Sequence, residues 1–309
     1  MARQMRLEYP GAIYQVMSRG NGRVAIVADD EDRKLWLETM GDLCHRTKWK
    51  IHAFCLMPHH FDLVVETPKA NLVDGMKWFL GTYTNRFNRR HKEYGHLFAG
   101  RYKSLIVDGD SPGYLKTVCD YVHLNPVRGK AIKPGEALRE FAWSSYPFYV
   151  GKPDERPAWL RVDRLLREWR VPKDSEAGRR TFGREMERRR KEVRPGEFEQ
   201  VEEGWYLGGE SLRRELLGRV ASRPDQSPYG GLGREAMELR AEELVVAGLK
   251  RLGWKEADLA RRRKGDEGKI RLAGKVRAQT EVSRVWIAKR LHMGSSAYVS
   301  RLLSRKKVK

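Results

Sequence analysis

The order of extended and helical segments near the N-terminus constrains the fold of this chain more than any other feature. Hydrophobic periodicity predicts a strand at 11–19, a helix at 29–48, strands at 50–57 and 61–67, a helix at 70–90 and a strand at 100–108. This β-α-β-β-α-β order is the ferredoxin-like split pattern. It predicts an α+β fold in which an antiparallel sheet carries helices on one face.

One more helix is expected after the last of these strands, at 111–124. Ser111 and Pro112 are typical of an N-cap followed by proline at the first helical position. Tyr121 and Asn125 are four residues apart, so their side chains share one face near the C-terminal end of this helix.

A histidine and a carboxylate lie two residues apart at the start of a predicted strand. His60 and Asp62 are therefore expected on the same face of the sheet. Their nitrogen and oxygen donors suit Mg²⁺ or Mn²⁺ better than a metal that prefers thiolates. The alternative interpretation is structural: a surface His–Asp pair, a core tyrosine at Tyr121, and Asn125 as the C-cap of its helix.

Charge is distributed unevenly along the 309 residues, which carry 62 Lys and Arg against 41 Asp and Glu, a net charge of +21. Residues 1–150 have a net charge of +6, whereas residues 261–309 alone hold 16 basic and 3 acidic side chains, a net of +13. Such a surplus implies a polyanionic partner, with nucleic acid the first candidate and an anionic membrane surface the second.

Composition excludes several other classes of protein. An apolar fraction of 40% and an aromatic fraction of 10% are too high for a wholly disordered chain. The sequence holds neither a membrane-spanning apolar run nor the apolar core of a secretory signal. Its three cysteines lack CxxC spacing, which argues against a disulfide scaffold or a thiolate zinc site. We expect a cytoplasmic, nucleoid-associated protein that does not contact membranes.

Three segments are expected along the chain. Residues 1–170 are predicted to form the α+β domain, and residues 171–231 a charged helical connector that ends in a Gly/Pro/Ser-rich linker at 222–233. Residues 232–309 are predicted to form an all-α basic domain. Its last two helices, around a turn at His292-Met293-Gly294, fit a helix-turn-helix whose second helix Ser295 caps.

Several runs of sequence carry a resemblance to a known family: AFCLMPHHFDLVVETP (53–68), GHLFAGRYKSLIVD (95–108), YLKTVCDYVHLNPVRGKAI (114–132), MSRGN (17–21) and WSSYPFYVG (143–151). In this order they resemble the REP-associated tyrosine transposases, which belong to the single-tyrosine branch of the HUH superfamily of single-strand DNA nucleases. The resemblance covers residues 5–170. Residues 250–305 resemble the replication-initiator-type helix-turn-helix tail that some of these proteins carry.

The resemblance implies a role for each site residue. Tyr121 would attack a DNA phosphodiester, forming a 5′-phosphotyrosine link and releasing a 3′-hydroxyl. His60 matches the first histidine of the family's His-hydrophobe-His pair, Phe61 the hydrophobe, and Asn125 the third metal ligand. Asp62 stands where the family has the second histidine. Two outcomes follow: a working site with a shifted metal preference, or a nuclease weakened by an added negative charge close to an anionic substrate.

Basic side chains interleaved with aromatic ones suit contacts with phosphates and unpaired bases. The candidates in the first domain, where Arg19 belongs to the MSRGN run, are Arg19, Arg86, Arg89, Arg90, Arg101 and Lys103. The candidates for a DNA groove in the tail are Ser295, Ser296, Tyr298 and Arg301. The alternative is that the aromatic neighbours Phe87, Phe98 and Tyr102 are core residues and the arginines merely solvated.

Three hypotheses of function follow. The first is a transposase-like endonuclease and strand transferase, monomeric or homodimeric, that cleaves single-stranded or hairpin DNA with a divalent metal. The second is a domesticated or catalytically weakened DNA-binding protein whose metal site has decayed at Asp62. The third is a transcriptional regulator that binds duplex DNA through the C-terminal domain.

Overall fold

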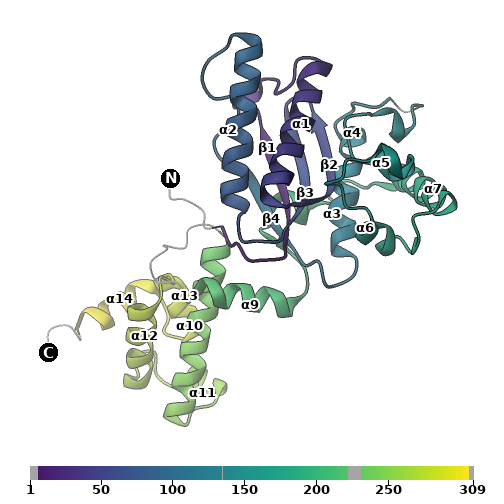
Figure 1. The fold of residues 1–309 in the computed structure, drawn as a ribbon. Coiled ribbons are helices and arrows are strands. Elements are labelled where there is room, and N and C mark those ends of the chain that lie inside the picture. Colours follow the sequence, from purple (N-terminus) through teal and green to yellow (C-terminus); the bar gives the residue numbers. More distant parts are fainter. Residues whose placement is uncertain (1–5, 134, 222–230, 306–309) are drawn as a thin grey trace. The chain divides into compact units, whose positions relative to one another are not determined.

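The computed structural model describes residues 6–133, 135–221 and 231–305 (Figure 1). The chain forms two compact units, one of residues 8–210 and the other of residues 211–309 together with 1–7. No helix in the described part of the chain is long and apolar enough to cross a membrane.

The first unit is built on a five-stranded sheet of order β2-β3-β1-β4-β5. The strands are β1 (Ala12–Arg19), β2 (Lys50–Met57), β3 (His60–Thr67), β4 (Lys103–Val107) and β5 (Tyr206–Leu207). β1 pairs antiparallel with β3 and β4, and β2 with β3. The first four strands have the ferredoxin-like order, so the predicted fold class is confirmed. The two-residue β5 was not predicted, and because it runs parallel to β4 the whole sheet is mixed.

Two long helices, α1 (Asp30–Thr47) and α2 (Leu72–His91), cover one face of the sheet; the short η1 (Asn21–Arg23) precedes them. The Asp29 side chain caps α1 by accepting a hydrogen bond from the Asp32 amide (3.0 Å). Strand alternation directs the Phe61 ring toward these helices, where it lies 5.4 Å from the Trp36 ring, centroid to centroid. Buried aromatic side chains therefore hold this layer on the sheet.

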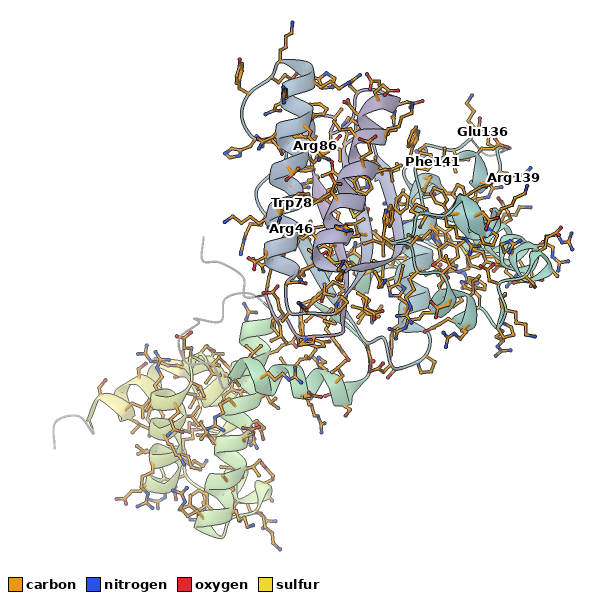
Figure 2. All side chains as sticks on the ribbon, in the orientation of Figure 1. Arg46, Trp78, Arg86, Glu136, Arg139 and Phe141 are labelled. Atoms are coloured by element: carbon orange, nitrogen blue, oxygen red, sulfur yellow. The ribbon has the colours of Figure 1, made fainter. Side chains whose placement is uncertain are left out.

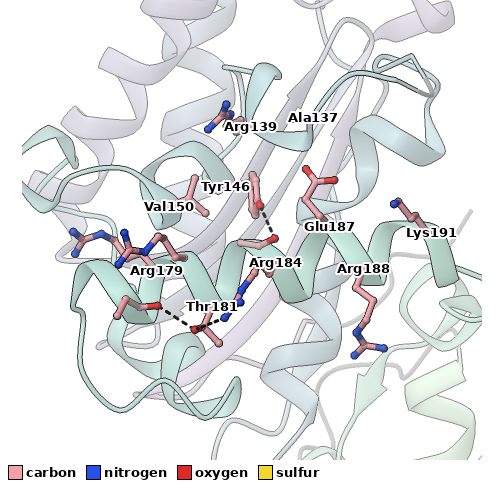
Figure 3. Close-up of a pocket in the computed structure, with 13 residues that line it drawn as sticks. Ala137, Arg139, Tyr146, Val150, Arg179, Thr181, Arg184, Glu187, Arg188 and Lys191 are labelled. Atoms are coloured by element: carbon pink, nitrogen blue, oxygen red, sulfur yellow. Dashed lines mark hydrogen bonds between the residues drawn. The ribbon is translucent and has the colours of Figure 1, made fainter.

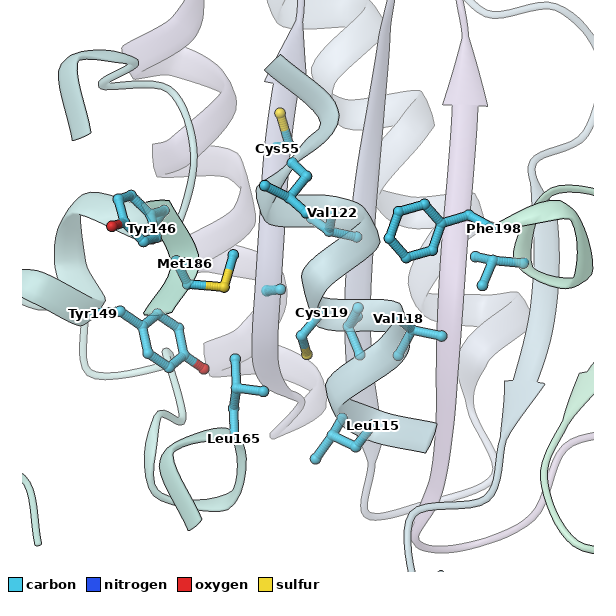
Figure 4. Packing of buried hydrophobic residues seen from close by; sticks show 14 of the residues in the cluster. Cys55, Leu115, Val118, Cys119, Val122, Tyr146, Tyr149, Leu165, Met186 and Phe198 are labelled. Atoms are coloured by element: carbon cyan, nitrogen blue, oxygen red, sulfur yellow. The ribbon is translucent and has the colours of Figure 1, made fainter. Parts of the chain in front are cut away.

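The opposite face of the sheet is covered as well. α3 (Tyr114–His123) packs Leu115, Val118 and Val122 into a core cluster that includes Ile13 and Val64 of the sheet (Figure 4). The expectation of helices on one face only was therefore wrong. Both faces of the central strands are apolar, and each needs a covering layer.

The start of α3 also differs from the prediction. Its N-cap is Gly113 (φ +93°) rather than Ser111, because the Ser111 amide donates to the Asp108 carboxylate (3.1 Å) in the preceding turn. Beyond α3, Pro126 lies in the first turn of a separate short helix, α4 (Asn125–Arg128), where a proline is tolerated.

Residues 138–207 complete the first unit. They form η2 (Leu138–Glu140), α5 (Tyr146–Val150), η3 (Pro153–Glu155), α6 (Asp163–Glu168), α7 (Glu176–Glu192), α8 (Glu199–Glu203) and β5. Phe182, Met186 and Phe198 contribute to the same core as α3. The functional division of the chain at residues 170 and 231 stays a prediction.

The second unit is largely helical, as expected. It contains α9 (Glu210–Ala221), α10 (Gly231–Leu252), α11 (Glu256–Arg261), α12 (Glu267–Gln279), α13 (Arg284–Arg290) and α14 (Ser296–Arg305), with Glu210 at the boundary between the units. The Ser295 hydroxyl accepts a hydrogen bond from the Tyr298 amide (3.2 Å) and so caps α14. Most of the predicted linker at 222–233 lies outside the described residues.

Candidate functional site

Two of the three proposed metal ligands are among the first residues of β3. His60 is the first residue of the strand and Asp62 the third, so both face α3, whereas Phe61 faces α1 and α2. His59 belongs to the turn that precedes the strand. The predicted alternation of side chains along this strand is present in the structure.

The start of α4 brings Asn125 onto this pair. The Nδ2 of Asn125 donates to Oδ2 of Asp62 (2.6 Å) and lies 3.3 Å from Nε2 of His60. The Nε2 of His60 is 3.5 Å from Oδ2 of Asp62. From β1, Gln15 donates through Nε2 to Oδ1 of Asp62 (2.8 Å). Two residues from distant parts of the chain, Gln15 and Asn125, therefore converge with His60 on one carboxylate.

Burial controls the protonation of this cluster. The Asp62 side chain is 1% exposed, and this burial raises its pKa to about 7, against the opposing effects of Arg128, Gln15 and Asn125. Burial also lowers the pKa of His60, which favours the neutral imidazole. The neutral imidazole is the form that binds a divalent cation, whereas the Asp62 carboxyl has to lose its proton before it can act as a ligand.

The spacing of these donor atoms is compatible with such a cation. Ligands at 2.1 Å from an octahedral metal lie about 3 Å apart when adjacent, and the three contacts here span 2.6–3.5 Å. Rotating the Asn125 amide by 180° turns its carbonyl oxygen toward the pair, giving one nitrogen and two oxygen donors. These residues fit Mg²⁺ or Mn²⁺. Within the described residues no group of three or more His, Cys, Asp or Glu could hold a metal ion, so an amide has to supply the third donor.

Tyr121 lies on α3, one turn before Asn125, and is partly buried against the core. Its ring meets the Phe198 ring edge-on at 5.5 Å between centroids, and the Arg128 guanidinium lies 4.2 Å from its ring centroid. Burial and the Asp62 carboxyl raise the pKa of Tyr121 to about 12, and Arg128 opposes this rise. Arg128 is thus the group that favours the phenolate.

Arg128 is itself held by a carboxylate from α8. Its guanidinium forms an ion pair with Glu202, and both side chains are partly exposed. No sequence motif indicated the roles of Arg128, Glu202, Phe198 or Gln15. Arg128 follows Tyr121 by seven residues, a same-face helical spacing that could have identified it. Phe198 and Glu202 are more than seventy residues from Tyr121, and no local pattern indicates their contact.

Two of the proposed DNA-binding arginines are engaged inside the protein. Arg86 donates to Asp42 (2.7 Å), and Arg90 to Asp29 (2.7 Å) and to the fully buried Asp32 (2.7 Å). Figure 2 shows Arg46 beside Trp78, and Arg86 further along α2. The Arg86 and Arg90 guanidinium groups hold α2 to α1, and DNA phosphates would have to compete with carboxylates for them.

The other proposed contacts of the first unit are accessible. Arg19 at the end of β1, Arg89 on α2, and Arg101 and Lys103 at the start of β4 are exposed. The aromatic residues between them are not: Phe87, Phe98 and Tyr102 are at most 7% exposed. The core interpretation of these aromatics is correct, so base stacking on them would require the core to open.

The tail candidates lie at the start of α14. Ser295 and Arg301 are exposed, while Ser296 and Tyr298 are half-buried. The Arg301 guanidinium stacks on Tyr298, 5.0 Å from the ring centroid. These four residues stay proposed contacts.

Comparison with known proteins identifies the segment that carries the site. Residues 9–125 match the family model described as "Transposase IS200 like", a range that includes His60, Asp62, Tyr121 and Asn125. No curated protein matches the chain. One similar solved structure is described as "Structure of the REP associates tyrosine transposase bound to a REP hairpin"; it is 13% identical, covers 53% of this chain and 93% of that chain, and has a TM-score of 0.43. Residues 9–125 are therefore similar to the IS200-like transposases, which confirms for this segment the resemblance noted in the sequence.

Proposed function

We propose that this chain is a transposase-like endonuclease and strand transferase that cleaves single-stranded or hairpin-associated DNA through a 5′-phosphotyrosine intermediate. One observation carries the proposal: the helical segment that bears Tyr121 also places Asn125 within 2.6 Å of Asp62 and 3.3 Å of His60. A nucleophile and three metal-compatible side chains are thus combined in the matched domain.

The proposed chemistry is a phosphoryl transfer. The Tyr121 oxygen bonds to phosphorus while the bond from phosphorus to the 3′-oxygen of the preceding nucleotide breaks. The phenol loses its proton to solvent, and the departing 3′-oxygen takes one up from solvent, so charge and protons balance. A divalent cation held by His60, Asp62 and Asn125 would supply Lewis acidity at the scissile phosphate.

The protein's own groups prepare Tyr121 for this step. The raised pKa of Tyr121, about 12, opposes formation of the nucleophile, so a compensating positive charge is needed. Arg128 supplies it from 4.2 Å above the ring. The Phe198 ring packs edge-on against the phenol ring and so restricts its orientation.

A covalent-capture assay tests the proposal. Purified protein is incubated with a labelled DNA hairpin and Mg²⁺ or Mn²⁺, and the adduct is resolved on a denaturing gel. Wild type should form an adduct, and Tyr121→Phe should not. Tyr114→Phe, which changes another tyrosine of α3, is the matched control and should retain it. Absence of an adduct with every metal, while DNA binding is intact, would refute the enzyme.

A second candidate function is a DNA-binding protein without cleavage. It is favoured by the hydrogen bonds that both Asp62 oxygens accept, from Gln15 and Asn125, which satisfy the buried carboxyl without any metal. An Asp62→His variant separates the two. A gain of adduct over wild type places a defect at Asp62, whereas equal activity supports a working carboxylate ligand.

A further inference from the structure

A basic groove lies along α7, outside the segment that matches the transposase family. It is lined by α7 and by residues of the η2–α5 region, and its volume is about 900 Å³ (Figure 3). Its cationic lining residues are Arg139, Arg179, Arg180, Arg184, Arg188 and Lys191. The site built on Tyr121 uses none of them.

The carboxylate in the lining, that of Glu187, is already neutralised by other groups. It accepts a hydrogen bond from the Leu138 amide (2.7 Å) and forms an ion pair with Arg190 (2.9 Å). The groove is therefore positive, because its single acid is bound to groups outside the cationic row.

Four of the cations form a row on one face of α7. Arg180, Arg184, Arg188 and Lys191 follow one another at spacings of four, four and three residues. On an α-helix these positions fall within an arc of about 80° and extend over about 16 Å of the axis. A compact anion would need cations that converge on one point. A row suits an extended polyanion.

The ion pairs of this row are weak ones. Arg180 pairs with Glu176, and Arg188 with both Glu185 and Glu192, with all five side chains at least 41% exposed. Exposed pairs of this kind contribute little free energy and exchange readily for a phosphate. Arg139, Arg184 and Lys191 form no ion pair with any residue that the structure describes. Two of the four cations of the row, Arg184 and Lys191, are thus available to a ligand at once, and the weak pairs of the other two can exchange for it.

The floor of the groove is small and largely apolar. Ala137, Val150 and Gly183 contribute to it, beside Tyr146. A Cβ at Gly183 would lie 3.3 Å from Val150, so α7 approaches α5 closely there. Apolar floors flanked by cations suit a sugar–phosphate chain, whose sugars are less polar than its phosphates.

We propose that this groove binds the sugar–phosphate backbone of DNA. Each strand of a duplex carries about one phosphate per 3.4 Å of axis, so the row spans about five phosphates of one strand. The choice of DNA as the polyanion rests on the proposed function. The groove would hold the same DNA at a place separate from the Tyr121 site.

Binding of full-length protein to labelled DNA, without divalent metal, tests the proposal. The groove variant combines Arg180→Gln, Arg184→Gln, Arg188→Gln and Lys191→Gln. The control removes four exposed charges of the same unit by Lys50→Gln, Lys69→Gln, Lys152→Gln and Lys173→Gln. Affinity is measured by fluorescence anisotropy over a range of salt concentrations, in separate arms with duplex and single-stranded DNA.

The groove variant should lose at least about tenfold in affinity, and its salt slope should fall by about 3, in the arm that uses the groove. The control should retain affinity and slope. Equal losses in both variants, or no loss in the groove variant, would overturn the proposal. Failure of wild type to bind either DNA would overturn the proposed function as well, which distinguishes the two failures.

Lysine acetylation gives a second, local readout. Saturating DNA should protect Lys191 from acetylation severalfold, as measured by mass spectrometry, while exposed Lys50 on β2 should react as in the free protein. An unprotected Lys191 in the saturated complex would contradict a groove-bound backbone even if the affinities changed.

Discussion

Arg128 influences the ionisation of the Tyr121 hydroxyl group. It lies over the phenol ring and lowers the pKa that burial and Asp62 raise. We expect Arg128→Met to slow adduct formation about 100-fold near neutral pH, because the developing phenolate loses its compensating charge. The rate should recover partly at higher pH. Adduct rates measured from pH 6 to 10, against Arg128→Lys, which keeps the charge, check this.

Glu202 should act in the opposite direction. Its carboxylate pairs with Arg128 and raises the pKa of Tyr121. Glu202→Gln is therefore expected to increase the rate modestly, about two- to fivefold, since the carboxylate is half-exposed and screened. Glu203→Gln, on the same short helix, serves as the control and should leave the rate unchanged. A slower Glu202→Gln variant would instead make Glu202 a support that holds Arg128 in place.

Glu66 makes stability depend on acid pH. The His52 hydrogen bond and the Arg161 and Arg164 charges hold its pKa at about 2, well below its usual value. A carboxyl whose pKa is lower in the folded state stabilises the fold above its unfolded pKa and loses that effect as the pH falls toward 2. Glu66→Gln should lower the free energy of unfolding by about 1–3 kcal/mol at pH 6. The difference from wild type, measured by urea unfolding, should shrink steadily between pH 5 and 2; a constant difference would contradict this.

Local spacing predicted that His60 and Asp62 share one face of a strand, as they do on β3. It also predicted Tyr121 and Asn125 on one helix, whereas they lie on α3 and on the separate short helix α4. It did not anticipate that Arg86 and Arg90 pair with acids of α1, because those contacts join residues more than forty positions apart. The same holds for Gln15 and Glu202. Charge type is visible in a sequence, but whether a charge has a partner is decided by the tertiary fold.

At the scale of elements, Lys269 joins three segments of the helical unit. It is fully buried, and its ammonium donates to the carbonyl oxygens of Leu259 (2.6 Å), Arg262 (3.1 Å) and His292 (3.3 Å). The end of α11 and the turn before α14 are thereby tied to α12. The side chain compensates for its buried charge by satisfying carbonyls at the end of α11 and in the turn.

Lys269→Met should keep the stem of the side chain and leave these carbonyls without their donor. We expect a loss of about 2–4 kcal/mol in the unfolding of this unit. Lys275→Met, which changes a half-buried lysine of the same helix, should cost less than about 0.5 kcal/mol. Denaturant unfolding followed by circular dichroism measures both. Equal stability of Lys269→Met and wild type would show that water or a rearranged side chain replaces the ammonium.

Elements whose own periodicity is strong were predictable, as β1 to β4 and α1 to α3 show. Their ends were less so: the Ser111-Pro112 signal failed because Asp108 binds the Ser111 amide and moves the helix start to Tyr114. β5 could not be predicted at all. A two-residue strand is too short to show a hydrophobic periodicity. It forms because the edge of β4 is open to pairing with Tyr206 and Leu207.

At the scale of the whole molecule, charge and chemistry are divided between the two units. Residues 211–309 hold 25 basic and 11 acidic side chains, a net charge of +14 out of the total of +21. The transposase-family segment and the Tyr121 site belong to residues 8–210. In line with the proposed function, we propose that the first unit acts on unpaired DNA and that the basic unit anchors the chain on duplex DNA.

Ending the chain at Glu210 tests that division. The shortened protein should keep the sheet unit, because the core on both faces of the sheet is supplied by residues before 210. It should still form the Tyr121 adduct with a hairpin, whereas duplex affinity should fall at least tenfold and the salt slope should drop by about 0.9 for each phosphate contact removed. Cooperative thermal unfolding is the control for folding. An unchanged duplex affinity and slope would remove the anchoring role from residues 211–309 and leave duplex binding to the first unit, where the basic groove of α7 is the surface to test next.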